Sequence, residues 1–260
     1  MDTRPLTHPV HLDACLGGHT LDSLEESPGI RSPTVESRMW VQEEAVLIAV
    51  DGVYSAGKST MIELLVRQIS RHWSREVLVS EWNSSELVGQ HIPQWKRDGR
   101  LGAYSLLFAE ATDLAHRTET VIGPHLAAGG VVVADRYAAS GMARALIRGA
   151  ESAVVQAAFA FAPAETMTVL VECDAATTLR RRTRLGKVLD GYHSGRDYRQ
   201  GLSINDDFVD YQESMAALYR QLIPQRGRYL TVDTTATAAE DVVKQIMAHL
   251  GASRHAVASA

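Results

Sequence analysis

The segment GVYSAGKST carries residue types and a spacing that suit phosphate binding. It fits the pattern G-x-x-x-x-G-K-[ST] from Gly52 to Ser59. Its glycines allow a tight loop whose backbone N–H groups point inward at phosphate oxygens. We expect Lys58 to reach the β- and γ-phosphates of a nucleoside triphosphate and Ser59 to ligate Mg²⁺. The residues expected to bind ATP are Gly52, Val53, Tyr54, Ser55, Ala56, Gly57, Lys58, Ser59 and Thr60.

This loop occurs in several classes of protein, and two of them lack support here. A GTPase would carry an N-K-x-D element and a transporter ATPase an L-S-G-G-Q-like signature, and neither string occurs. A small-molecule kinase needs only the loop, a magnesium-linked carboxylate, an acceptor pocket and a lid, so this class is favoured.

A second charged cluster follows the apolar run VVVAD. Asp135 is suited to a water-mediated Mg²⁺ contact, and Arg136 to holding an acceptor phosphate or a developing charge. Ligands of open α/β sheets bind beyond the carboxyl ends of the strands, so we expect both residues near the phosphate loop. The alternative is a structural Asp–Arg pair that caps the sheet.

Two further segments bear candidate residues. Glu81 ends the run EVLVSE and could act as a base or orient Arg136, while Trp82 could stack on a base. The alternatives are an exposed glutamate and plain packing. The basic segment TTLRRRTRLGK supplies Arg181 and Arg184 as candidates for stabilising the transferring phosphoryl group, although most of its charges fit a solvated helix face.

Apolar runs that alternate with helical patterns must position these residues. Strands are expected at 45–50, 76–82, 130–135, 166–174 and 229–233. Helical patterns follow the loop and occur near 100–120 and over 238–250. Such alternation predicts a three-layer α/β/α fold in which a parallel sheet of about five strands is wrapped by helices.

Composition sets the domain boundaries and the cellular context. We expect a disordered extension over 1–40, one domain over 41–250 with a mobile lid at 185–205, and a disordered tail over 251–260. The formal charge of −5 gives no sign of a nucleic-acid partner, and no apolar run is long enough for a membrane span. Two cysteines, Cys15 and Cys173, fit reduced thiols of a cytoplasmic protein.

Taken together, these segments resemble the thymidylate kinases. The resemblance covers most of 45–250 and includes DGVYSAGKST, SLLFAEATDLAH, the pattern D-R-Y-x-x-S-x-x-A from Asp135 to Ala143, LRRRTR and DFVDYQESMAALY. It implies transfer of the ATP γ-phosphoryl group to a pyrimidine nucleotide, with ATP and Mg²⁺ as cofactors and a homodimer as the assembly. Carried over, Arg136 serves the acceptor, and Asp51 or Asp135 serves the magnesium and acceptor region.

The acceptor half departs from the family pattern. Ser80 to Ser84 replace an Arg-Glu-Pro-Gly-Gly-like turn, Asp113 is followed by Leu114, and the lid carries Asp190-Gly191 in place of an Asp-Arg pair. Three functions therefore stay open: a thymidylate kinase, a kinase of the same fold acting on a nucleoside or another small hydroxyl compound, and an ATP-binding regulator without turnover. The residues expected to bind the acceptor are Glu81, Trp82, Arg117, Arg136, Tyr137, Ser140 and Arg144.

Overall fold

The computed structural model describes residues 45–199, 201 and 203–257, with side chains up to residue 251. All of them lie in the unit Ser37–Ala260. The extension predicted for residues 1–40 falls outside the described residues.

A five-stranded parallel sheet forms the centre of this unit and confirms the predicted α/β architecture. The strand order is β2-β3-β1-β4-β5, so β1 lies in the middle. The predicted strand ends differ from the observed ones by at most two residues. The strands are β1 Val46–Gly52, β2 Val77–Glu81, β3 Val131–Asp135, β4 Met167–Glu172 and β5 Tyr229–Asp233.

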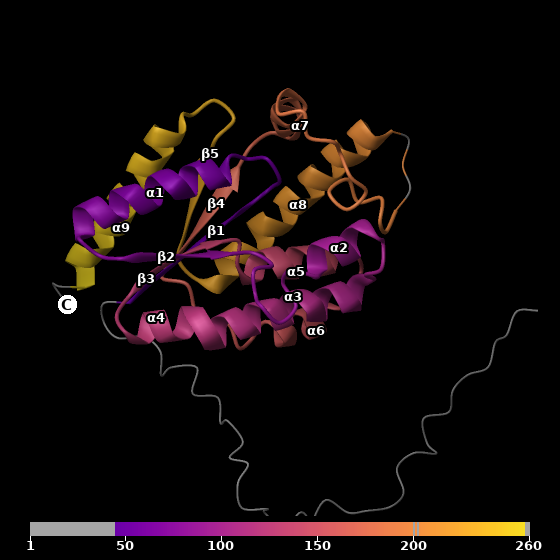
Figure 1. The fold of residues 1–260 in the computed structure, drawn as a ribbon. Coiled ribbons are helices and arrows are strands. Elements are labelled where there is room, and N and C mark those ends of the chain that lie inside the picture. Colours follow the sequence, from indigo (N-terminus) through magenta and orange to yellow (C-terminus); the bar gives the residue numbers. More distant parts are fainter. Residues whose placement is uncertain (1–44, 200, 202, 258–260) are drawn as a thin grey trace, which may run out of the picture. The chain divides into compact units, whose positions relative to one another are not determined.

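Helices cover both faces of the sheet (Figure 1). On one face α1 packs against α9, and on the other α5 packs against α3 and α8. Apolar side chains at helical spacing on α1, including Met61, Leu65 and Ile69, are buried in this core. The bounds of these helices are α1 Lys58–Trp73, α3 Ala103–Arg117, α5 Ala138–Ile147, α8 Ile204–Arg226 and α9 Ala239–Val257.

Shorter helices connect these elements. The long helix predicted near 100–120 continues beyond α3 as one π-helical segment and then as a short helix that starts just before Pro124. Helix α9 extends to Val257, so residues 251–257 are helical where the sequence predicts a frayed tail. The shorter helices are α2 Ile92–Arg97, η3 Thr118–Ile122, α4 Gly123–Ala127, α6 Ser152–Ala158 and α7 Ala175–Arg184.

The sheet register brings the charged strand ends to one edge. Val50 of β1 and Glu81 of β2 both lie opposite Asp135 of β3. Because the strands are parallel, the loops that follow them all leave at this edge. The segment predicted to be a lid, 185–205, consists of turns and coil up to Ser203 in the part that the structure describes.

Candidate active site

The phosphate loop connects β1 to α1, as the sequence predicts. Gly57 precedes α1 in a left-handed conformation with φ 91°. Gly52 has φ 147°, and a Cβ atom there would lie 2.2 Å from the carbonyl oxygen of Val171. Only glycine fits this position, because the backbone conformation and the neighbouring strand both exclude a side chain.

Lys58 lies inside the loop in this structure. Its Nζ donates to the carbonyl oxygen of Gly52 at 3.2 Å and to that of Val53 at 2.6 Å. Burial, together with the nearby charge of Arg136, lowers the pKa of Lys58 well below its ordinary value, although Asp135 and Asp51 oppose the shift. The ammonium group is therefore poorly solvated, and phosphate oxygens would be strong partners for it.

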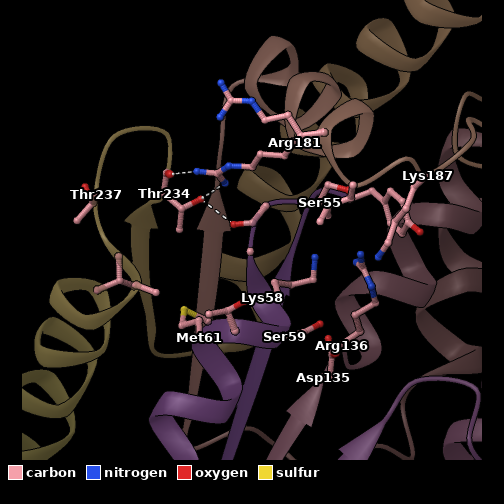
Figure 2. A pocket seen from close by; sticks show the side chains of 18 residues that line it. Ser55, Lys58, Ser59, Met61, Asp135, Arg136, Arg181, Lys187, Thr234 and Thr237 are labelled. Atoms are coloured by element: carbon pink, nitrogen blue, oxygen red, sulfur yellow. Dashed lines mark hydrogen bonds between the residues drawn. The ribbon is translucent and has the colours of Figure 1, made fainter.

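A cavity of about 670 Å³ opens above the loop. Figure 2 shows Lys58, Ser59, Asp135 and Arg136 around the same opening, with Arg181 on its far side. Arg181 is held there, because its Nη2 donates to the carbonyl oxygen of Thr234 at 2.5 Å. The loop residues that line this cavity are Tyr54, Ser55, Ala56, Gly57, Lys58, Ser59 and Thr60, and the predicted Arg184 lines it as well. Gly52 and Val53 do not line the cavity, and their carbonyl oxygens accept hydrogen bonds from Lys58.

Arg136 is held in a strained position between elements. It has a left-handed φ of 71°, which is rare for a residue with a side chain and frequent at functional sites. Its Nη1 donates to the carbonyl oxygen of Gly52 at 2.8 Å, to Tyr219 Oη at 3.1 Å and to Ser140 Oγ at 3.3 Å. Ser140 Oγ in turn donates to the buried carboxylate of Asp51. These contacts hold the guanidinium beside the carboxyl ends of β1 and β3.

A second cavity, of about 660 Å³, lies on the other side of Arg136. Of the residues predicted to bind the acceptor, Glu81, Trp82, Arg136 and Arg144 line it. Tyr54, Asp135 and Arg136 line both cavities. A phosphoryl donor in the first cavity and an acceptor in the second would therefore meet at these three residues.

Besides Gly52 and Val53, four predicted site residues line neither of these cavities. Tyr137 is fully buried, and its hydroxyl donates to the carbonyl oxygen of Pro163, so its side chain belongs to the core. Asp51 and Ser140 lie behind Arg136. Arg117 is held by Asp113 at 2.9 Å, behind the ring of Trp82.

The segment predicted as a lid contacts the phosphate loop. The ring of His193 stacks on Tyr54 with 3.9 Å between centroids. Gln212 joins the two segments, because its Oε1 accepts from Tyr54 N at 2.8 Å and its Nε2 donates to His193 O at 3.0 Å. Burial lowers the pKa of His193 to about 4 despite the nearby Asp190, so its ring is neutral at pH 7.

The residues present at the loop fit a magnesium ion bound together with phosphates. The Ser59 hydroxyl and the Asp135 carboxylate line the same cavity and are hard oxygen donors. Behind them, Asp51 Oδ2 is buried without a hydrogen-bond partner and adds negative charge to this edge. The described residues contain no cluster of three or more His, Cys, Asp or Glu side chains that could hold a metal alone.

Several lining residues escaped the sequence analysis. Lys96, Tyr192 and His193 line the second cavity, and Glu110 lies fully buried behind it. A signal existed for Glu110: it falls on the apolar face of a helical segment, where an unpaired charge would be costly. Its partners lie 14 to 34 residues away in sequence, so spacing alone does not reveal them.

Comparisons with known proteins agree with this architecture. Residues 50–246 match the family model described as Thymidylate kinase. The chain is 28% identical over 188 residues to a "Probable thymidylate kinase 2" of Saccharolobus solfataricus, covering 72% of this chain and 87% of that protein. It is 28% identical over 207 residues to a "Thymidylate kinase" of Cereibacter sphaeroides, covering 76% and 90%. A "Thymidylate kinase" of Xanthomonas campestris pv. campestris is 31% identical over 136 residues, covering 52% and 60%.

Proposed function

Because the chain belongs to the thymidylate kinase family, a family of ATP-dependent kinases, we propose that it transfers the γ-phosphoryl group of ATP to thymidylate. The observation that carries the proposal is the shared wall of the two cavities: Asp135 and Arg136 face both. A donor and an acceptor bound on either side would place their phosphates at the same pair of side chains, which suits direct transfer.

Each residue has a role in this proposal. Lys58 exchanges its two carbonyl partners for β- and γ-phosphate oxygens, and Arg136 binds the acceptor phosphate from its fixed position. Arg181 and Arg184 lie in the donor cavity, where a guanidinium can stabilise the transferring group. Ser59 and Asp135 would hold Mg²⁺. When bound, Mg²⁺ would neutralise phosphate charge and orient the transferring group.

The acceptor cavity supplies the remaining contacts. Trp82 offers part of its indole ring, and Glu81 and Arg144 offer an acceptor and a donor of hydrogen bonds. The Arg144 guanidinium lies over the Trp82 ring, 5.3 Å from its centre, so a pyrimidine would pack against the indole beside Arg144 while its phosphate binds Arg136. No described helix is both long and apolar enough for a membrane span. The homodimer implied by the resemblance and the cytoplasmic location inferred from the two cysteines stay predictions.

A panel of acceptors tests the proposal. ADP formation is measured with ATP and Mg²⁺ in the presence of thymidylate, deoxycytidylate, thymidine and unrelated hydroxyl compounds. We expect the highest kcat/KM with thymidylate. Turnover of a nucleoside or another hydroxyl compound without turnover of thymidylate would assign the chain to the second kinase class. ATP binding without turnover of any acceptor would instead favour the regulator.

A further inference from the structure

A single buried carboxylate connects three elements around the acceptor cavity. Glu110 of α3 is fully buried. Its Oε1 accepts hydrogen bonds from Lys96 Nζ of α2 at 2.6 Å, from Trp82 Nε1 after β2 at 3.3 Å and from Arg144 Nη1 of α5 at 3.4 Å. One carboxylate oxygen thus accepts hydrogen bonds from three side chains. The fold brings these side chains together from separate parts of the chain.

The three donors form part of the cavity wall, while Glu110 lies behind it. Trp82, Lys96 and Arg144 all line the acceptor cavity. The Arg144 guanidinium lies 5.3 Å from the centre of the Trp82 ring, and Lys96 Nζ lies 4.5 Å from the centre of the Tyr192 ring. Because these side chains contact one another and Glu110, a substitution at Glu110 would change the positions of all three donors that line the cavity.

The charges of this unit do not cancel. Burial alone would raise the pKa of Glu110, but Lys96 and Arg144 lower it below its ordinary value, so the carboxylate stays ionised. Two cations thus share one anion. Ammonium and guanidinium groups donate hydrogen bonds and accept none. This part of the wall therefore offers the acceptor positive charge and hydrogen-bond donors, while Glu81, Asp190 and Asp197 line other parts of the cavity.

We propose that Glu110 is a positioning residue for acceptor specificity, which holds Lys96 and Arg144 as a donor-only wall for carbonyl or anionic oxygens of the acceptor. The inference rests on the proposed function. It predicts that a pyrimidine with two ring carbonyl groups is preferred over cytosine, whose amino group would face donors and leave them unpaired.

A charge-removing variant tests this role. Glu110→Gln keeps the size of the side chain and one oxygen acceptor but removes the charge. We expect KM for thymidylate to rise about tenfold or more, because hydrogen bonds from charged donors to the carboxylate are lost or weakened. KM for ATP should stay within about twofold, and the preference for thymidylate over deoxycytidylate should fall. Glu119→Gln, an exposed glutamate of η3, is the matched control and should leave all three values unchanged.

A second variant covers the case in which Glu110→Gln fails to fold. Lys96→Met removes a donor from the wall and leaves Glu110 paired with Trp82 and Arg144. It should raise KM for thymidylate in the same direction. If both single variants fold, the double variant should raise KM for thymidylate by less than the product of the two single fold-changes, since both substitutions act on the same cluster. Unchanged KM values and an unchanged base preference in the variants would overturn the assignment.

A titration of the free protein separates this inference from the proposed function. Burial lowers the pKa of Lys96 to about 8, and Glu110 opposes this shift. Arg144 and Arg148 also lower the pKa of Lys96, its Nζ lies over the Tyr192 ring, and its charge acts on His193 as well. In Glu110→Gln the pKa of Lys96 should fall below 8, because the opposing charge is gone.

The measurement is NMR of ¹³Cε-labelled lysines, with the Lys96 resonance assigned by its loss in Lys96→Met. A shifted Lys96 titration in a protein that does not phosphorylate thymidylate would refute the proposed function but leave the Glu110 cluster standing. An unshifted titration would overturn the cluster, whatever the acceptor is.

Discussion

Replacement of Lys58 by Met removes the charge that the proposed reaction needs and keeps most of the side-chain volume. In the structure the ammonium group has two protein partners, the carbonyl oxygens of Gly52 and Val53. During the reaction the same group would bind oxygens of the transferring phosphate. Loss of one such preorganised donor costs about 3–4 kcal/mol of transition-state stabilisation. We therefore expect kcat to fall about 10²- to 10³-fold or more.

The stability of the free protein should change little. The carbonyl of Gly52 keeps its hydrogen bond from Arg136 at 2.8 Å, so only Val53 loses a partner, at a cost of about 1 kcal/mol. Removal of the ammonium offsets part of this cost, because burial lowers the pKa of Lys58 and so disfavours its charged form. A net change of about 1 kcal/mol shifts Tm by about 2–4 °C in a domain of this size.

The assay combines steady-state kinetics with thermal unfolding, with and without ATP and Mg²⁺. Lys244→Met is the control, since that lysine has a 77% exposed side chain and lies on α9. The Lys58 variant should lose both activity and most of the Tm increase caused by ATP, and the control should keep both. Activity within a few-fold of the parent would refute the role of Lys58. A Tm drop of 10 °C or more would instead attribute the loss to unfolding.

Three further predictions concern the loop and the segment above it. Gly52→Ala should lower the free energy of unfolding by about 3 kcal/mol in urea titrations, because its Cβ meets the Val171 carbonyl oxygen. Gly227→Ala has a similar positive φ but open space, so it should cost less. Ser59→Ala should raise the Mg²⁺ concentration for half-maximal activity about tenfold, without a change in Tm, as measured by Mg²⁺ titration of turnover. Tm should fall as the pH drops from 6.5 toward 4, because His193 takes up a proton in the unfolded chain at a higher pH than in the folded protein. His193→Gln should lack that part of the decrease. An unchanged slope of Tm against pH in this variant would contradict the burial of the ring.

The donor half of the site could be predicted from sequence because its chemistry is local. The residues from Gly52 to Ser59 are contiguous, and a strand and a helix position them directly. Asp135 was placed at the same edge by the rule that parallel strands end together, and the register bears this out. Local pattern and sheet topology were sufficient for this part.

The acceptor half depends on contacts between distant segments. Tyr137 immediately follows Arg136, yet its side chain points into the core while Arg136 faces the cavities. Sequence proximity to a motif therefore did not indicate function. Arg117 similarly lies behind Trp82 rather than in the acceptor cavity, because Asp113 one helical turn earlier holds it. Such placements follow from tertiary packing, which one sequence does not show.

Identification of the product tests the central claim most directly. The purified chain is incubated with ATP, Mg²⁺ and thymidylate, and the phosphorus resonances of the mixture are followed by ³¹P NMR. The proposed function predicts that ADP and thymidine diphosphate form in equal amounts and that Arg136→Ala forms neither at a comparable rate. Formation of ADP without thymidine diphosphate, or no loss of ATP, would contradict it.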